Sequence, residues 1–585
     1  MTIAAIGEAY GRKAAATPGA STVLALLAGL TALTMGLVQS MPARAVTSIA
    51  NTVHNLTPSG PGTFKASEAA GLCSYCHTPH NASPQRGLWN RSLSTATYQT
   101  YESSTLKAQV KQPSGSSRLC LSCHDGTLAM GTLRIAPQRV KPTLGLLTGA
   151  AVTGTDLSGD HPVSFTYDSA LAADRGELVD PAALPKAVRP DHQGELQCTS
   201  CHDAHEDRNS KFMRMDNRYA ALCTTCHVPN GWVGTSHASS NSTWNGVGIR
   251  PWSLSGYPTV AENACMSCHR PHAAGHGKRL LAQPSERANC TVCHAGSVAA
   301  KNIEAEFVKP SRHPVEVGEW THEPKEDAAL MKRHVACADC HNPHATNASA
   351  TTPPAVSGRL QGVRGIAQGG GLAAPAATEQ EVCYKCHGLT SAPTLGIQRQ
   401  DNVRNARLQF DPVNPSFHPV AAVGRNAAIT GLEPGYSAAS RIGCGSCHNN
   451  DAAATSGGPA GPHGSIYPFI LQRQYDTEQT VVESPQSFAL CYGCHTRSVL
   501  TMDLPLKFPH ARHLVVGQSS CASCHDPHGS RTNPRLVNFM RRDRNGVAVV
   551  TPSTAQQRLE FIPTAGGGQC YLMCHGINHE PKVYP

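Results

Sequence analysis

The sequence predicts a mostly irregular, loop-rich fold with short α-helices and little β-structure, elongated along six doublet repeats. Aromatic residues make up only 5% of the 585 residues, so a conventional aromatic core is thin. The 52 glycines and 42 prolines favour turns and loops. The 24 cysteines recur in short, regular pairs along most of the chain. Regular pairs of this kind indicate attachment points that pin the chain every few dozen residues, which makes long helices and sheets unnecessary.

The N-terminus has the layout of a secretory signal peptide. Arg12 and Lys13 precede an uncharged apolar stretch over 22–38, and an A-x-A cleavage pattern ends at Ala45. We predict a signal peptide over 1–45 that is removed after Ala45. An uncleaved membrane anchor is the alternative, but the apolar stretch is marginal for crossing a bilayer. The mature chain is therefore expected to be exported without a transmembrane span, and to be periplasmic, associated with the outer membrane, or extracellular.

Every cysteine belongs to a motif in which two cysteines are followed directly by a histidine. Eleven copies read C-x-x-C-H, whereas the twelfth is wider and reads C-x-x-x-C-H. The cysteine pairs are Cys73 and Cys76, Cys120 and Cys123, Cys198 and Cys201, Cys223 and Cys226, Cys265 and Cys268, Cys290 and Cys293, Cys337 and Cys340, Cys383 and Cys386, Cys444 and Cys447, Cys491 and Cys494, Cys521 and Cys524, and Cys570 and Cys574. The motif histidines are His77, His124, His202, His227, His269, His294, His341, His387, His448, His495, His525 and His575.

C-x-x-C-H is the attachment site of c-type haem. Its two thiols add to the two vinyl groups of one porphyrin, and the adjacent histidine then ligates the iron. Paired cysteines also build zinc sites or disulfides, but neither needs a histidine after every second cysteine. The sequence therefore predicts twelve covalently attached c-type haems. The wider loop between Cys570 and Cys574 either hampers attachment there or merely bulges.

The remaining histidines suffice to give every iron a second axial ligand. The motifs form six doublets, and the first motif of each is followed by a further histidine, usually three residues later. Another histidine precedes each doublet, three times within His-Pro-Val. The predicted second ligands are His54, His80, His161, His205, His237, His272, His313, His344, His418, His463, His510 and His528. Methionine ligation is possible with 11 methionines, but this histidine supply makes it unnecessary.

Six histidines are spare in this assignment: His192, His276, His322, His334, His513 and His579. Three of them, His192, His334 and His513, lie shortly before a motif and could replace some of the predicted ligands. His513 is the strongest rival, because the segment KFPHARH offers two histidines together.

The pattern resembles the doubled-CxxCH multihaem cytochromes c of metal-respiring and other anaerobic bacteria. The segments HNLTPSGPGTFK, CSYCHTPHNA, CLSCHDGT and DHPVSFTYD are the closest local matches, and the resemblance covers most of residues 54–585. It implies bis-histidine haems stacked as a chain and a role in extracytoplasmic electron transfer. Implied partners are redox proteins or an extracellular electron acceptor, an outer-membrane porin, or further copies in a filament. The widened last motif departs from the family pattern.

Two functions from different classes remain. The first is an electron carrier or conduit, in which no residue is catalytic. The alternative is a multihaem reductase of nitrite, hydroxylamine or a sulfur compound, which needs one iron with an open axial position. The irregular twelfth motif is the one hint of such a site. Nucleic-acid binding has little support, since the lysines and arginines are scattered and form no basic block.

The doublets divide the chain into six approximate modules after the signal peptide. They cover 46–150, 151–235, 236–305, 306–400, 401–505 and 506–585. The fourth contains a segment over 346–381 that is rich in Ala, Gly and Pro and is expected to be a mobile surface insertion.

Overall fold

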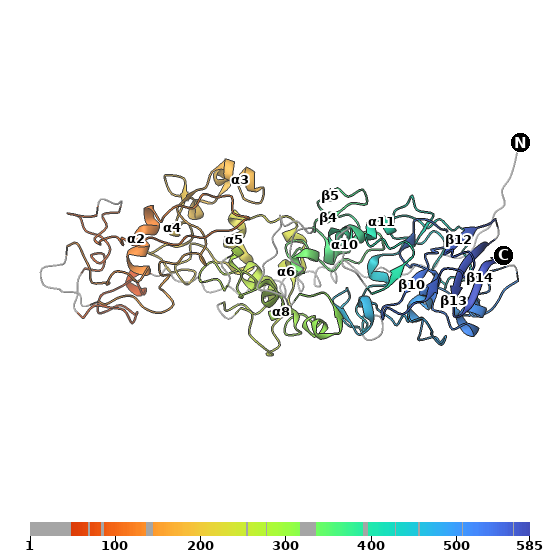
Figure 1. The fold of residues 1–585 in the computed structure, drawn as a ribbon. Helices are drawn as coiled ribbons and strands as arrows, with labels where there is room; N and C mark the ends of the chain where they lie inside the picture. The colour runs from red at the N-terminus through yellow and green to blue at the C-terminus, as the bar shows by residue number, and fades with distance from the viewer. Residues whose placement is uncertain are drawn as a thin grey trace, which may run out of the picture.

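The computed structural model describes residues 48–585 apart from 68–70, 84–86, 136–143, 253–254, 276–277, 316–334, 390–395, 428, 454–456, 506 and 566. The predicted signal peptide and the spare histidines His276, His322 and His334 lie outside the described residues. The body is elongated, and the chain advances along its long axis in sequence order (Figure 1). Helix α2 (Gly115–His124) lies towards one end and strand β13 (Gly568–Cys574) towards the other (Figure 1).

Short helices carry most of the motifs. Those with motif residues are α2, α4 (Cys198–Cys201), α5 (Ala221–Cys226), η6 (Ala264–Ser267), α8 (Glu286–His294), α9 (Cys337–Cys340), α10 (Glu379–His387), η10 (Cys444–Ser446), α12 (Ala489–Tyr492) and α14 (Cys521–Cys524). Helices without a motif are α3 (Ser169–Arg175), α6 (Ser236–Ser239), α7 (Val260–Asn263), α11 (Ala406–Gln409) and α13 (Arg497–Leu500). A helix suits C-x-x-C because residues three apart lie on one helix face, so both thiols point the same way.

Most strands form two-residue to three-residue antiparallel pairs. These are β1 (Phe165–Thr166) with β2 (Glu195–Leu196), β3 (Ser311–Arg312) with β8 (Gly464–Ser465), β4 (Gly365–Ile366) with β5 (Leu372–Ala373), β6 (Gln398–Arg399) with β10 (Met540–Arg542), and β7 (Ser416–Phe417) with β9 (Gly529–Ser530). Several of these pairs join neighbouring doublets, as β3 with β8 does. The predicted loop-rich fold with short helices and little β-structure is confirmed.

The C-terminal region contains a four-stranded antiparallel sheet. Strands β11 (Val550–Thr551) and β12 (Glu560–Pro563) follow one edge of β13, and β14 (Ile577–Tyr584) pairs with the other. The twelfth motif lies in this sheet, since Cys570 and Cys574 belong to β13. Short helices therefore do not carry the twelfth motif, nor the first, whose Cys73 and Cys76 lie in turns. The C-x-x-x-C spacing suits a strand, because alternate residues of a strand point to one face.

The apolar core of the described residues is divided into small clusters, most of which include motif cysteines. Cys76 and Cys123 pack on a cluster around Tyr75, for example, and Cys491 and Cys521 on one around Phe488. The cluster with the most members lies at the C-terminal sheet and includes Phe539 and Met540. Cores of this size are expected where a large apolar group held by the cysteines completes each cluster. No helix in the described part of the chain is long and apolar enough to span a bilayer.

The Ala-, Gly- and Pro-rich segment over 346–381 contributes to the packing of the fourth doublet. It contains the 3-10 helix η9 (Gly358–Leu360), the pair β4–β5 and the start of α10. Val363 and Ala376 are buried and pack against Val382 of α10. Part of this segment is therefore core, while residues such as Leu372 are exposed.

Candidate functional site

Histidine rings distant in the sequence face each other at a nearly constant spacing. Ten motif histidines each lie opposite one predicted second ligand, with ring centroids 6.1–6.4 Å apart. The pairs are His54–His124, His77–His205, His161–His227, His202–His272, His237–His294, His269–His344, His313–His387, His341–His463, His418–His495 and His448–His528. Two metal–nitrogen bonds of about 2 Å, plus the distance from each nitrogen to its ring centre, account for this spacing. One iron fits between the rings of each pair.

The pairing follows one rule along the chain. A second-motif histidine pairs with the histidine upstream of its own doublet, as His124 does with His54. A first-motif histidine pairs with the trailing histidine of the next doublet, as His77 does with His205. Each doublet thus completes a site of the doublet before it.

The two kinds of pair also differ in ring orientation. Interplanar angles are 14–43° in the five pairs that include a first-motif histidine. They are 44–88° in the five pairs that include a second-motif histidine. The ring planes are therefore closer to parallel in the first kind of pair than in the second, and the two ranges meet at 43–44°.

The rule ends at both termini of the repeat. His80 has no doublet before it; its side chain is exposed, and among the described residues no histidine ring lies opposite it. His525 has no doublet after it, and its pKa is lowered to about 4, first by burial and then by the charge of His510. His575 follows β13 in a turn, and no described histidine ring faces it at the common spacing.

A hydrogen bond at Nδ1 fixes most of these rings. Among motif histidines, Nδ1 donates to the carbonyl oxygens of Gly87, Ala151, Lys211, Arg279, Arg359, Phe469 and Arg535. The second ligands His54, His237 and His418 donate to carbonyls of Ala204, Pro343 and Pro527, each directly before the trailing histidine of the next doublet. A ring that donates through Nδ1 leaves its Nε2 lone pair free for a metal.

Burial keeps many of these imidazoles neutral. It lowers the pKa of the motif histidines His227, His294, His387 and His495 to about 4. It lowers the pKa of the second ligands His344, His463 and His528 to about 4 as well. His272 is an exception, because the hydrogen bond to Asp160 raises its pKa. A neutral imidazole is the form that binds iron.

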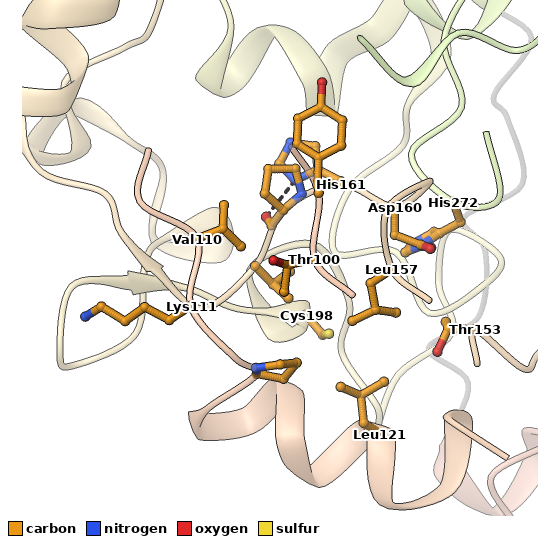
Figure 2. A pocket seen from close by; sticks show the side chains of 14 residues that line it. Thr100, Val110, Lys111, Leu121, Thr153, Leu157, Asp160, His161, Cys198 and His272 are labelled. Carbon is orange, nitrogen blue, oxygen red and sulfur yellow. Dashed lines mark hydrogen bonds and ion pairs between the residues drawn. The ribbon is translucent and has the colours of Figure 1, made fainter. Parts of the chain in front are cut away.

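A cavity of about 50 Å³ lies between the third motif and its predicted second ligand. Figure 2 shows the side chains of Cys198, His272 and His161 around it, with Leu121 and Leu157 among its apolar walls. Asp160 lies beside His272, and its Oδ1 accepts from Nδ1 of that ring at 2.8 Å. Its apolar walls, a motif thiol and an imidazole form a lining of the kind that the edge of a haem contacts.

Comparisons with known proteins agree with this geometry. The family model described as "Doubled CXXCH motif" matches residues 190–231, 258–299 and 513–547. The chain is a multihaem c-type cytochrome. It is 24% identical over 212 residues to the "Multiheme cytochrome MtrA" of Shewanella baltica (strain OS185). That match covers 34% of this cytochrome and 44% of the relative, so it spans less than half of the relative's length.

Cysteines of successive motifs in this cytochrome are side-chain neighbours. Within doublets the neighbours are Cys76 and Cys123, Cys201 and Cys226, Cys268 and Cys293, Cys340 and Cys383, Cys447 and Cys494, and Cys524 and Cys574. Between doublets they are Cys120 and Cys198, Cys223 and Cys265, Cys290 and Cys337, Cys383 and Cys444, and Cys491 and Cys521. Because each cysteine marks the edge of its attachment site, these contacts join the twelve motifs in sequence order.

Sequence reasoning missed the groups that orient the rings. Asp160 and Gln409 are the side chains that accept from Nδ1 of His272 and His528, at 2.8 and 3.0 Å. Asp160 directly precedes His161 in the segment DHPV, which is the only local signal. The backbone carbonyls leave no signal, because any residue type provides one.

Proposed function

We propose that this cytochrome is an extracytoplasmic electron conduit in which twelve bis-histidine haems follow one another in sequence order. The observation that carries the proposal is the series of ten histidine pairs along an elongated body, together with the neighbouring cysteines that link all twelve motifs in sequence order. The haem iron supplies the redox chemistry by alternating between the ferric and ferrous states. The chain's own residues fix the position of each iron site, fill its axial positions with imidazole and orient the imidazole rings.

Closed axial positions favour transfer over catalysis. In each of the ten pairs both faces of the iron site are filled by imidazole, so no position is left there for a substrate. Nδ1 bonds to backbone carbonyls fix the ring tautomer and orientation, which supports the same ligand geometry in both oxidation states. Burial around the rings excludes water and keeps the ligands neutral, as the lowered pKa values of His227 and His344 indicate.

The forward sharing of ligands supports the spacing that transfer requires. Five sites take an imidazole from the next doublet, so those doublets cannot separate without the loss of a ligand. Three further sites have a ring that donates to a backbone carbonyl of the next doublet. His237, for example, pairs with His294 and donates to Pro343 O of the following doublet at 3.1 Å. Sites held in this way keep a constant spacing from one to the next.

The elongated shape suggests that electrons enter and leave at opposite ends. Helix α2, which carries the second motif, lies towards one end of the body, and strand β13, which carries the cysteines of the twelfth motif, lies towards the other (Figure 1). A periplasmic, outer-membrane-associated or extracellular location, and redox proteins, an outer-membrane porin, further copies or an extracellular acceptor as partners, belong to this proposal.

The alternative is a reductase with one open iron, and one observation favours it. His575 lies in a turn, and no described histidine ring faces it at the common spacing. A twelfth iron bound by His575 alone would have a free axial position. Such a site would react with small ligands, whereas the closed sites would not.

Low-temperature EPR of the oxidised holoprotein tests the two functions, with carbon monoxide added to the reduced form and intact mass giving the haem count. The conduit predicts twelve haems, all low-spin and inert to carbon monoxide. One high-spin haem per chain that binds carbon monoxide would support the reductase instead.

A further inference from the structure

Arg91 carries a buried positive charge inside the first doublet. Its side chain is 1% exposed, and among the described residues it is the one lysine or arginine that is buried. Its guanidinium donates to the carbonyl oxygens of Ser122, Ala129 and Met130, whereas its Nε is buried without a hydrogen-bond partner. No carboxylate in the described part of the chain forms an ion pair with it. A guanidinium stays protonated in proteins, so this charge is permanent and lacks a counter-ion there.

The segment around Arg91 joins the two motifs of the doublet. The preceding residue, Asn90, donates from its backbone nitrogen to Cys76 O of the first motif at 2.8 Å. Arg91 itself reaches the second motif, since its guanidinium donates at 3.1 Å to Ser122 O, directly before Cys123. Cys76 and Cys123 pack on one apolar cluster. The charge therefore lies where the two attachment sites meet, in surroundings of low dielectric constant that strengthen its electrostatic effect.

The charge acts most clearly on the first motif. Burial raises the pKa of the Cys76 thiol to about 12, and Arg91 opposes this shift by stabilising the thiolate. No carboxylate in the described part of the chain contributes to that pKa. Burial also raises the pKa of Cys123, but there the Asp125 carboxylate acts against Arg91. Negative charge is therefore stabilised at the first motif, whereas at the second motif the two side chains oppose each other.

The same position of other doublets holds no buried charge. A backbone N–H that donates to the carbonyl of the second cysteine of the first motif defines this position, which is the next residue along the chain. It is Arg91 in the first doublet, Arg473 in the fifth and Phe539 in the sixth. Arg473 is exposed, so solvent and salt screen its charge. Phe539 is buried in an apolar core, which shows that the position does not need a charge to pack.

We propose that Arg91 raises the reduction potential of the haem held by Cys73 and Cys76, and that electrons therefore collect at the end of the body that carries α2 (Figure 1). An electron that arrives from the neighbouring haem adds one negative charge, which a fixed positive charge stabilises. A unit charge in a protein interior changes such an equilibrium by on the order of tenfold, which is about 59 mV for a one-electron couple. The inference rests on the proposed twelve-haem conduit and gives it a direction.

The test marks the first iron and then removes the charge, in the full-length holoprotein. His205→Ala should open the iron beside His77 and give it a high-spin EPR signal of its own. Adding Arg91→Gln should lower the midpoint potential of that signal by about 59 mV, because glutamine keeps a hydrogen-bond donor but no charge. Arg91→Lys keeps the charge and should leave the midpoint potential close to its original value.

Two controls use marked irons in other doublets. His344→Ala marks the iron beside His269, and adding Arg91→Gln there should leave the marked signal unchanged. His528→Ala marks the iron beside His448 in the fifth doublet. In that background, Arg473→Gln should shift the signal by less than Arg91→Gln shifts the first, because solvent screens the exposed charge.

An unchanged or raised midpoint potential in Arg91→Gln overturns the inference. An equal fall in Arg91→Lys also overturns it, because the effect would then be structural rather than electrostatic. If Arg91→Gln does not accumulate, the marked irons are compared directly. The signal of His205→Ala should titrate at a higher potential than that of His344→Ala, and the reverse order overturns the inference. Absence of a high-spin signal in His205→Ala would instead contradict the ligand pairing on which the conduit rests.

Discussion

The central doublets and the last doublet hold their sites in different ways. In the centre, motifs lie on short helices, and each first-motif histidine borrows its partner from the next doublet, as His269 does from His344. In the last doublet the second motif lies on a sheet, and the available partners, His510, His513 and His579, come from the same doublet. A repeat that shares ligands forward has no neighbour at its end, so its terminal unit must be built differently.

The two regions should also differ in what stabilises them, and this gives the largest predicted effect. Phe539 is 1% exposed and belongs to the C-terminal cluster with Met540 and Val550. Phe539→Ala should lower the free energy of unfolding by about 3–5 kcal/mol, because it leaves a cavity in a packed core. Phe417, which is buried outside the clusters, is the matched site, and Phe417→Ala should cost less. Urea unfolding followed by tryptophan fluorescence and haem absorbance measures both, and equal losses would contradict a special role for the C-terminal core.

Ligand sharing gives the second prediction, from two histidines at the same position of the repeat. His344 lies opposite His269, whereas His80 is exposed and faces no described histidine ring. His344→Ala should open one iron per chain, seen as a high-spin EPR signal and carbon monoxide binding. His80→Ala should leave every iron low-spin. An opened iron in His80→Ala would show that the pairing rule does not end at the first doublet.

The third prediction concerns the hydrogen-bond acceptor at Nδ1 of His272. Asp160 accepts from His272 at 2.8 Å, while most ligand rings donate to a backbone carbonyl. A carboxylate acceptor makes the imidazole a stronger donor to iron, which stabilises the ferric state. Asp160→Asn should therefore raise one midpoint potential. A difference of about 1 kcal/mol between charged and neutral hydrogen bonds corresponds to roughly 40 mV for a one-electron couple.

EPR-monitored redox titration measures this shift. Asp156→Asn is the control, since Asp156 lies nearby and accepts from the backbone of Ser158. A fall in potential in Asp160→Asn, or an equal rise in the control, would contradict the role of the carboxylate.

The spacing of cysteines and histidines along the sequence made much of the candidate site predictable. The motif fixes which cysteines and histidine can reach one porphyrin, and ten of the twelve predicted second ligands lie opposite a motif histidine. Which ring faces which motif was not predictable, because the partner comes from another doublet more than 100 residues away in cases such as His77 and His205. The C-terminal sheet was missed because β14 reads INHEPKVY, in which polar residues and a proline mask the strand.

The smallest predicted effect concerns the stability that two ion pairs contribute. One has a buried carboxylate beside the second motif of the fifth doublet, and the other is exposed on the C-terminal sheet. The carboxylate of Glu483 is 6% exposed, and it accepts from Tyr492 at 2.8 Å and from Arg497 at 2.7 Å. The hydrogen bond from Arg497 is the largest cause that lowers the pKa of Glu483.

A carboxyl with a lowered pKa stabilises the fold above its unfolded pKa of about 4.3, and this contribution is lost as the pH falls through the folded pKa. Glu483→Gln should therefore destabilise the protein at pH 7 by up to about 1 kcal/mol, since Arg497 is 43% exposed and solvent screens the pair. The difference from the unaltered chain should shrink in melts below about pH 4.3 and disappear once the pH lies below the lowered pKa of the folded state. Glu560→Gln, on the sheet, should cost less at pH 7, since both side chains of its pair with Arg558 are exposed. A Glu483 effect that persists in acid would mean that the carboxyl acts by packing Tyr492 rather than through its charge.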